Sequence, residues 1–292
     1  MGGTSRERQV SLWTGDQISN GLVEIGHDVT SFDLTHHNSG ELIIRALEAD
    51  LVFNALHGPG GEDGTVAGFL ETIGAKYTHS GVFASAVAMD KYTTRKLAEA
   101  VGIRVPAGRL CTVEDLRELE FTFPYVIKPR FEGSTIGVTI IQDRSNQSAP
   151  TEWLFRGEPL VEKFIPGLEI SCAVVNGTAI DTVEIEHHHS GIFDFDSKYL
   201  DPTTKHIIPA RMPLSENIKA KQWSELIYEE LGCKDVARVD FRYDPGMGEE
   251  GLFFLEVNTH PGMTSTSLLP DIMRANGVQF TELLAMIVNN HA

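Results

Sequence analysis

Apolar positions in the first 88 residues alternate between helical and extended spacing. Residues 8–25 and 41–47 carry apolar side chains at the three- and four-residue intervals that place them on one face of a helix. Residues 28–33 and 51–54 are short runs that favour strands. This alternation predicts a parallel sheet covered by helices, and such sheets bind ligands where loops gather at the carboxyl ends of their strands.

Beyond residue 88 the pattern predicts helices mixed with antiparallel strands. Asn176-Gly177 between two apolar runs is a strong hairpin signal, and the Pro-Gly turn within 244–248 predicts a second hairpin. The predicted helices are 65–73, 91–100, one that begins at Thr112, 215–231 and 280–289. The predicted strands are 124–129, 160–166, 169–175, 178–185, 237–241 and 251–255. We therefore divide the chain into an N-terminal domain (1–88), a central subdomain (89–166) and a C-terminal subdomain (167–292).

Candidate metal ligands lie on the last two predicted strands. Glu256 and Asn258 are two residues apart and share a face of their strand, as do Arg238 and Asp240 on the preceding one. If the strands pair, Asp240, Glu256 and Asn258 form an oxygen-only cluster, which suits Mg²⁺ and nucleotide phosphates better than zinc. The alternative is that these are acidic strand residues that simply face solvent. The hydroxyl-rich turn 261–267 favours a ligand site, because backbone N–H groups in such a turn can face an anion.

Two glycine-rich loops and two lysines are further candidates. The loop 57–64 follows a predicted strand and has four glycines, and the loop 132–138 places hydroxyl residues between glycines. Both allow the backbone to approach a ligand, although the first also suits a tight turn before the next helix. The loop 132–138 is not a Walker A loop, because the Gly-Lys-Ser/Thr ending is absent. Lys91 and Lys128 are either phosphate ligands or ordinary surface lysines.

Composition narrows the class of partner. The chain has 24 Lys and Arg against 41 Asp and Glu, a net charge of −17, which argues against nucleic acid and membranes but not against ATP. Its three widely spaced cysteines form neither a disulfide framework nor a zinc motif, which indicates the cytoplasm. Three adjacent histidines, 187–189, cannot all face one ion on an extended segment, so we do not expect a metal there.

Six motifs in order resemble those of one known family. They are Gly2-Gly3-Thr4-Ser5-Arg6-Glu7-Arg8, His57-Gly58-Pro59-Gly60-Gly61-Glu62-Asp63-Gly64, Met89-Asp90-Lys91, Lys128-Pro129 with Glu132-Gly133-Ser134-Thr135, Ser197-Lys198-Tyr199, and Glu256-Val257-Asn258-Thr259-His260-Pro261-Gly262. Through them nearly the whole chain resembles the D-alanine–D-alanine ligases of the ATP-grasp superfamily. The resemblance implies an α/β fold, with an N-terminal parallel-sheet (pre-ATP-grasp) domain followed by the two α+β subdomains of an ATP-grasp fold.

The resemblance also implies a function. Enzymes of this family join two D-alanines to D-Ala-D-Ala through a D-alanyl phosphate, at the expense of ATP, for peptidoglycan precursor synthesis. The implied cofactors are ATP and two Mg²⁺ ions, with Mn²⁺ as a substitute. The implied enzyme is a cytoplasmic homodimer that binds neither nucleic acid nor membrane.

At matching positions the resemblance implies a set of site residues. The implied metal ligands are Asp240, Glu256 and Asn258. The implied catalytic residues are Glu7, Ser134, Lys198, Tyr199, Arg238 and Gly262. The implied ATP-binding residues are Lys91, Lys128, Glu162, Lys163, Phe164, Ile165 and Glu169. The implied substrate-binding residues are His57, Ser267 and Leu268.

The chain departs from the family pattern at a few places. His79 replaces the usual glycine, and residues 193–196 contain Phe and Asp where tyrosines are common. The family's first buried strand has no counterpart before Gly2, so we expect the functional protein to extend upstream of Met1. Two alternatives stay open: another ATP-grasp carboxylate–amine ligase with a different acceptor, and a nucleotide-binding module without turnover.

Overall fold

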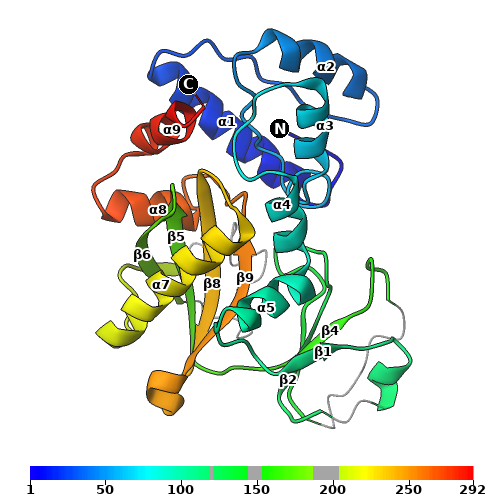
Figure 1. Ribbon diagram of the computed structural model, residues 1–292, viewed down its shortest axis with the longest axis vertical. Helices are drawn as coiled ribbons and strands as arrows, with labels where there is room; N and C mark the ends of the chain where they lie inside the picture. The colour runs from blue at the N-terminus through cyan, green and yellow to red at the C-terminus, as the bar shows by residue number, and fades with distance from the viewer. Residues whose placement is uncertain (119–120, 144–152, 187–203, 292) are drawn as a thin grey trace.

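The structure is a computed structural model that describes residues 1–118, 121–143, 153–186 and 204–291. Its two sheets occupy different parts of the molecule, and the N-terminal helices lie at one end (Figure 1). The 187–189 histidines and residues 193–196 lie outside the described residues, as do Lys198 and Tyr199.

A five-stranded antiparallel sheet forms the centre of the C-terminal half, in the order β7-β6-β5-β8-β9. Its strands are β5 (Leu168–Val175), β6 (Thr178–Glu186), β7 (Lys205–Ile207), β8 (Val236–Tyr243) and β9 (Leu252–Asn258). Both predicted hairpins are confirmed. Asn176 and Gly177 have φ of +50° and +79°, the left-handed conformation that a tight hairpin turn requires. In the second hairpin, Asp240 lies opposite Glu256.

Helices cover both faces of this sheet. Ile170, Cys172 and Val174 alternate along β5 and pack toward α4 (Val82–Met89), α5 (Lys91–Ala100) and α7 (Leu214–Leu231). Ala173 and Val175 point the other way, toward α8 (Leu268–Ala275), α9 (Phe280–Asn289) and one end of α1 (Arg8–Glu24). A sheet buried on both faces holds its strands in a fixed register, so residues on β8 and β9 make a rigid base for a site.

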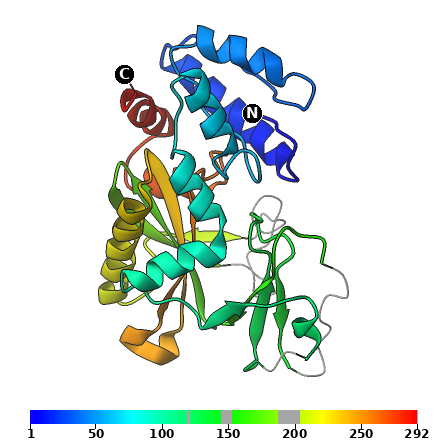
Figure 2. The ribbon, with the colours of Figure 1, turned by 45° about the vertical axis from the view of Figure 1, so that its right-hand side comes forward.

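A four-stranded antiparallel sheet, in the order β1-β4-β2-β3, forms the central part of the chain (Figure 2). Its strands are β1 (Gly108–Leu110), β2 (Tyr125–Lys128), β3 (Thr139–Ile141) and β4 (Leu160–Lys163). Tyr125, Ile127 and Val161 form its small core with Cys111 and Leu116. Residues 164–167 connect β4 to β5 and so join the two sheets. The predicted division at residue 166 stays a prediction.

The predicted parallel sheet in residues 1–88 is wrong in its extent. Helices α1, α2 (Ser39–Glu48) and α3 (Thr65–Ile73) form as expected. Residues 28–33 are no regular strand, however, and 51–54 make only one bridge. In this region the structure describes two isolated parallel bridges, Gly2 with Leu34 and Val52 with Tyr77. A strand needs a hydrogen-bonded neighbour, and a cavity of about 630 Å³ lies where 28–33 and 51–54 face each other.

Smaller differences follow from local sequence. The helix predicted from Thr112 is a 3₁₀ turn, Asp115–Glu118, although Thr112 and Asp115 cap each other as expected. Five short elements were not predicted from the sequence: β1, β3, β7, α4, and α8 after the 261–267 turn. Among the described residues, no helix has the length and apolar character needed to cross a bilayer.

Candidate active site

Two adjoining pockets lie between the two sheets and the N-terminal loops. The larger is lined by β2, β4 and the connection to β5 on one side, and by β8 and β9 on the other. The smaller extends toward the N-terminal loops and contains Glu7, His57, Ser134, Asn258 and Gly262. Residues that line both pockets are Lys91, Glu132, Arg238 and Glu256. The two pockets therefore form one continuous site with shared charged groups.

The predicted acidic cluster is formed by the β8–β9 hairpin. Asp240 and Glu256 are direct partners in the ladder, and Arg238 lies opposite Asn258. Arg238 donates two hydrogen bonds to Asp240, at 2.8 and 2.7 Å, and Ser171 from β5 donates a third at 2.6 Å. The Lys91 ammonium lies 3.0 Å from Glu256. Each carboxylate thus has a cation beside it.

This donor set fits magnesium. Two carboxylates and an amide supply oxygen atoms only, the ligand type of hard cations. Within the described part of the chain, no cluster of three or more His, Cys, Asp or Glu side chains is placed to hold a metal by itself. An ion here would therefore need oxygen ligands beyond the carboxylates, which phosphate groups and water supply.

A buried charge network supports Lys128 at the end of β2. Its ammonium lies 2.5 Å from Oε2 of Glu162, whose other oxygen is 3.3 Å from the guanidinium of Arg95. All three side chains are buried. Arg95 also forms an ion pair with Glu99 at 3.3 Å, so cations and carboxylates alternate along the network, which ends with the Lys128 ammonium at the wall of the larger pocket. A buried network of this kind holds its members in fixed positions, because removing one partner leaves another charge uncompensated.

Arg242 organises the connection between the sheets. It lies 5.2 Å from the ring of Phe164 and donates hydrogen bonds to the carbonyl oxygens of Ile165 and Gly167, at 3.0 and 3.1 Å. It also forms an ion pair with Glu169 at 3.3 Å. Gly167 has φ of +94°, and a Cβ there would lie 2.2 Å from the carbonyl oxygen of Tyr243. Only glycine fits this turn, which presents Phe164 and Ile165 to the larger pocket.

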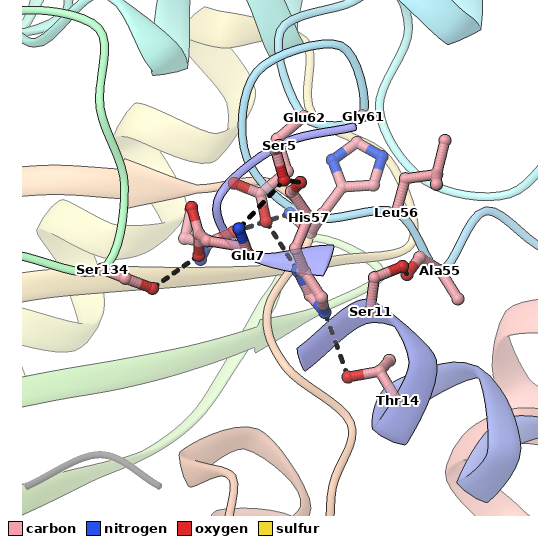
Figure 3. A network of polar contacts seen from close by, with 12 residues as sticks. Ser5, Glu7, Ser11, Thr14, Ala55, Leu56, His57, Gly61, Glu62 and Ser134 are labelled. Atoms are coloured by element: carbon pink, nitrogen blue, oxygen red, sulfur yellow. Dashed lines mark hydrogen bonds and ion pairs between the residues drawn. The ribbon is translucent and has the colours of Figure 1, made fainter. Parts of the chain in front are cut away.

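Hydrogen bonds from several loops hold Glu7 at the smaller pocket (Figure 3). Ser134 donates to Glu7 Oε2, and the backbone N–H of Glu7 donates to Ser5 Oγ at 3.1 Å. Ser5 in turn donates to the carbonyl oxygen of His57 at 2.6 Å. A Cβ at Gly133 would lie only 2.6 Å from the Glu7 carboxylate, so glycine allows this loop to approach.

The side chain of His57 is fixed at both ring nitrogens. Nδ1 lies 2.7 Å from Glu62 and Nε2 lies 3.0 Å from the Thr14 hydroxyl (Figure 3). Asp63 from the same loop accepts hydrogen bonds from the N–H groups of Gly60 and Thr65. The loop 57–64 therefore serves both predicted purposes, since it lines the smaller pocket and also begins α3.

The turn after β9 places Gly262 and the start of α8 beside the site. Gly262 lines the smaller pocket, and Leu268 lines the larger one. The Ser267 hydroxyl lies 2.8 Å from that of Thr264, and it accepts a hydrogen bond from the Thr264 N–H at 3.0 Å. Ser267 itself lines neither pocket, so its side chain fixes the turn.

Four residues that hold site residues in place were not predicted from the sequence: Glu62, Arg95, Ser171 and Arg242. Arg95 lies one helical turn after Lys91, and Ser171 lies opposite Asp240 in the ladder. Both could have been found once helix and register were assigned. Arg242 lies opposite Glu169 in the same ladder and could have been found in the same way, and Glu62 lies five residues after its partner His57 in the same loop.

Comparisons with known proteins identify the family. The family model "D-ala D-ala ligase N-terminus" matches residues 37–80, and "D-ala D-ala ligase C-terminus" matches residues 109–289. A D-alanine–D-alanine ligase of Gluconobacter oxydans is 44% identical over 293 residues, covering 99% of this chain and 96% of that protein. One from Erythrobacter litoralis is 41% identical, with coverage of 99% and 90%. The chain belongs to the D-alanine–D-alanine ligase family.

Solved structures of the family share the fold. The ligase of Bacillus anthracis complexed with ATP superposes with a TM-score of 0.82 at 31% identity, covering 100% of this chain and 95% of that one. The VanG D-Ala:D-Ser ligase of Enterococcus faecalis has a TM-score of 0.82 at 28% identity, with coverage of 100% and 98%. The expected α/β fold of the ATP-grasp type is confirmed.

Proposed function

We infer that this protein is an ATP-dependent D-alanine–D-alanine ligase, which forms D-Ala-D-Ala for peptidoglycan precursor synthesis. The observation that carries this inference is the continuity of the two pockets. An amino-acid subsite around Glu7 and a nucleotide subsite around Lys128 meet at Lys91, Arg238 and Glu256. Such a junction brings a substrate carboxylate next to a phosphoryl donor, which is what carboxylate activation requires.

The larger pocket would bind ATP. The flat apolar surface of Phe164 and Ile165 suits the adenine ring, with Glu162 and Lys163 on the same strand end, and Glu169 would accept ribose hydroxyls. Lys91 and Lys128 would contact the phosphates. When bound, two Mg²⁺ ions neutralise phosphate charge. Asp240, Glu256 and Asn258 would hold them, with Mn²⁺ as a substitute.

The smaller pocket would bind the first D-alanine. The Glu7 carboxylate would pair with its ammonium group, and Ser134 keeps Glu7 in place. The carboxylate of this D-alanine would then point to the junction, where phosphorylation makes it an electrophilic acyl phosphate. Arg238 and the Gly262 N–H would stabilise the oxyanion that forms when the second amine attacks.

The second D-alanine would bind at the start of α8. The N-terminus of a helix favours a carboxylate, so Leu268, which lines the larger pocket, and Ser267, which precedes it, would hold that end of the substrate. His57 would line the substrate pocket. We assign the lid contacts to Lys198 and Tyr199, which lie outside the described residues. We place the enzyme in the cytoplasm and expect a homodimer.

Phosphate release tests this function. With ATP and Mg²⁺, D-alanine should give phosphate and D-Ala-D-Ala, whereas L-alanine should give neither. Activity with L-alanine equal to that with D-alanine would refute the assignment. D-serine and D-lactate should compete poorly at pH 7 as acceptors, and a predominantly mixed product would point to the alternative of a ligase with another acceptor. ATP binding without any turnover would point to a nucleotide-binding module.

A further inference from the structure

A stacked pair of buried histidines joins the N-terminal loops to the turn that follows the metal-binding strand. The ring centroids of His79 and His260 are 4.8 Å apart and the rings are inclined by only 16°, and Phe53 makes a T-shaped contact with His79 at a centroid distance of 5.4 Å. Both histidines are almost completely buried. His79 comes from the segment before α4, whereas His260 lies two residues after Asn258.

Each ring nitrogen of His260 has a defined partner. Nε2 lies 3.1 Å from the Asn54 amide nitrogen, which can only donate, so Nε2 accepts. Nδ1 therefore carries the proton and donates to the Thr259 hydroxyl at 3.1 Å. The ring thus has one tautomer and one orientation.

Asn54 connects His260 to the loop 57–64. Its amide nitrogen also donates to the carbonyl oxygen of Gly61 at 3.2 Å, and its oxygen accepts from the Leu56 N–H at 3.1 Å. It therefore fixes the loop that contains His57. On the opposite side, the backbone N–H of His260 donates to the Asn258 side-chain oxygen at 2.8 Å. One chain of contacts runs from the His57 loop through Asn54 and His260 to Asn258.

We propose that His260, held by Asn54 and His79, is a positioning residue that orients Asn258 for the metal and links that orientation to the N-terminal substrate loop. An amide side chain can rotate and present nitrogen or oxygen. The His260 N–H can donate only to the amide oxygen, so the amide nitrogen is turned away. His79 closes the other face of the ring and is itself tied to the C-terminal half, because its N–H donates to Asp235 at 2.6 Å.

This proposal rests on the proposed metal site, so its test measures metal dependence with and without turnover. The primary variant is His260→Leu, which removes the acceptor for Asn54 and the aromatic stack. His260→Gln restores an acceptor without the ring. Asn54→Leu breaks the same link from the other side and serves if His260→Leu does not fold. The matched control is His291→Gln, because His291 binds the same Asp235, at 2.8 Å, but lies outside the chain of contacts.

The first measurement is calorimetric binding of a non-hydrolysable ATP analogue as Mg²⁺ is varied. His260→Leu and Asn54→Leu should raise the half-saturating Mg²⁺ concentration about fivefold or more, and the double variant should do no worse than either single one. His260→Gln should recover most of this loss. His291→Gln should lower the melting temperature and leave the Mg²⁺ dependence unchanged.

The second measurement is phosphate release with D-alanine. The two leucine variants should raise KM for the first D-alanine severalfold, while KM for ATP at saturating Mg²⁺ changes less than twofold. An unchanged Mg²⁺ dependence in His260→Leu, or an equal shift in His291→Gln, would overturn the proposal. If the wild-type protein releases no phosphate, the proposed function fails, and the calorimetric titration still decides the role of His260.

Discussion

The two halves of the site are held in place by different means. On the C-terminal side, Arg238, Asp240 and Glu256 stand on paired strands of a sheet that is covered on both faces. On the N-terminal side, Glu7 and His57 stand on loops whose neighbouring segments make only isolated bridges. Backbone ladders fix the metal and phosphate ligands, whereas side-chain hydrogen bonds fix the amino-acid ligands.

The two kinds of support suit different steps of the reaction. Phosphoryl transfer needs charges at fixed distances, which a ladder supplies. Substrate entry needs a part that can open, and a loop held by a few side-chain hydrogen bonds opens at a lower free energy than a sheet. The contrast predicts that perturbations of the N-terminal side act on substrate affinity, and that perturbations of the C-terminal side act on turnover.

The largest expected difference is in hydrogen exchange. Val29, Thr30 and Ser31 make no backbone hydrogen bond with any described residue, whereas Cys172 and Val174 are paired on β5 and buried. Amides in 29–31 should therefore exchange at least about 10⁴-fold faster than those of β5, because the latter require global unfolding. Mass spectrometry of the exchanging protein would measure both. Equal protection of the two segments would contradict the proposed difference in rigidity between the N-terminal and C-terminal sides.

Glu256→Gln tests the C-terminal side. The substitution keeps the shape and removes the charge beside Lys91, where phosphoryl charge develops. We expect turnover to fall at least about a hundredfold with the melting temperature nearly unchanged. The control is Glu225→Gln, because this carboxylate on α7 accepts from the Ala179 N–H and lines neither pocket. Near-normal turnover of Glu256→Gln at saturating Mg²⁺ would rule out its role as a ligand.

Two serines allow a matched comparison of the halves. Ser11 on α1 donates to the carbonyl oxygen of Ala55 at 2.6 Å, two residues before His57, and is fully buried. Ser11→Ala leaves that carbonyl without its side-chain partner, which costs about 1–3 kcal/mol, and should raise KM for the first D-alanine. Ser171→Ala leaves Asp240 with both bonds from Arg238, so it should cost less than about 1 kcal/mol. Chemical denaturation would measure both, and equal losses would contradict the comparison.

Local patterns predicted the C-terminal half well and the N-terminal half less well. The hairpin that pairs Asp240 with Glu256 follows from strand period and turn chemistry, which act over a few residues. Residues 28–33 have strand composition but no partner along most of their length, and partners are not encoded in the segment itself. The same limit applies to the Lys128–Glu162–Arg95 network and the His79–His260 stack, which depend on how distant elements pack.

The smallest expected effect concerns acid stability of the junction between the halves. Burial lowers the pKa of His79 to about 4, opposed by Asp235 and assisted by His57 and His291, and His260 stacks on it. The unfolded chain has a histidine pKa near 6.5, so it binds the proton more readily than the folded chain. The contribution of neutral His79 to the free energy of unfolding is therefore complete above about pH 6.5, and it is lost progressively as the pH falls toward 4. From pH 7 to 5.5 the free energy of unfolding of the wild type should fall by about 1 kcal/mol through His79, which corresponds to a few degrees of melting temperature.

The variant His79→Gly tests this pH dependence, because glycine tolerates the φ of +75° at this position. Its melting temperature should change less between pH 7 and 5.5 than that of the wild type, whereas His27→Gln, at an exposed position, should behave like the wild type. Parallel profiles for wild type and His79→Gly would show that His79 is not protonated on unfolding in this range. His260 should retain part of the slope, since its pKa is lowered by burial in the same sense.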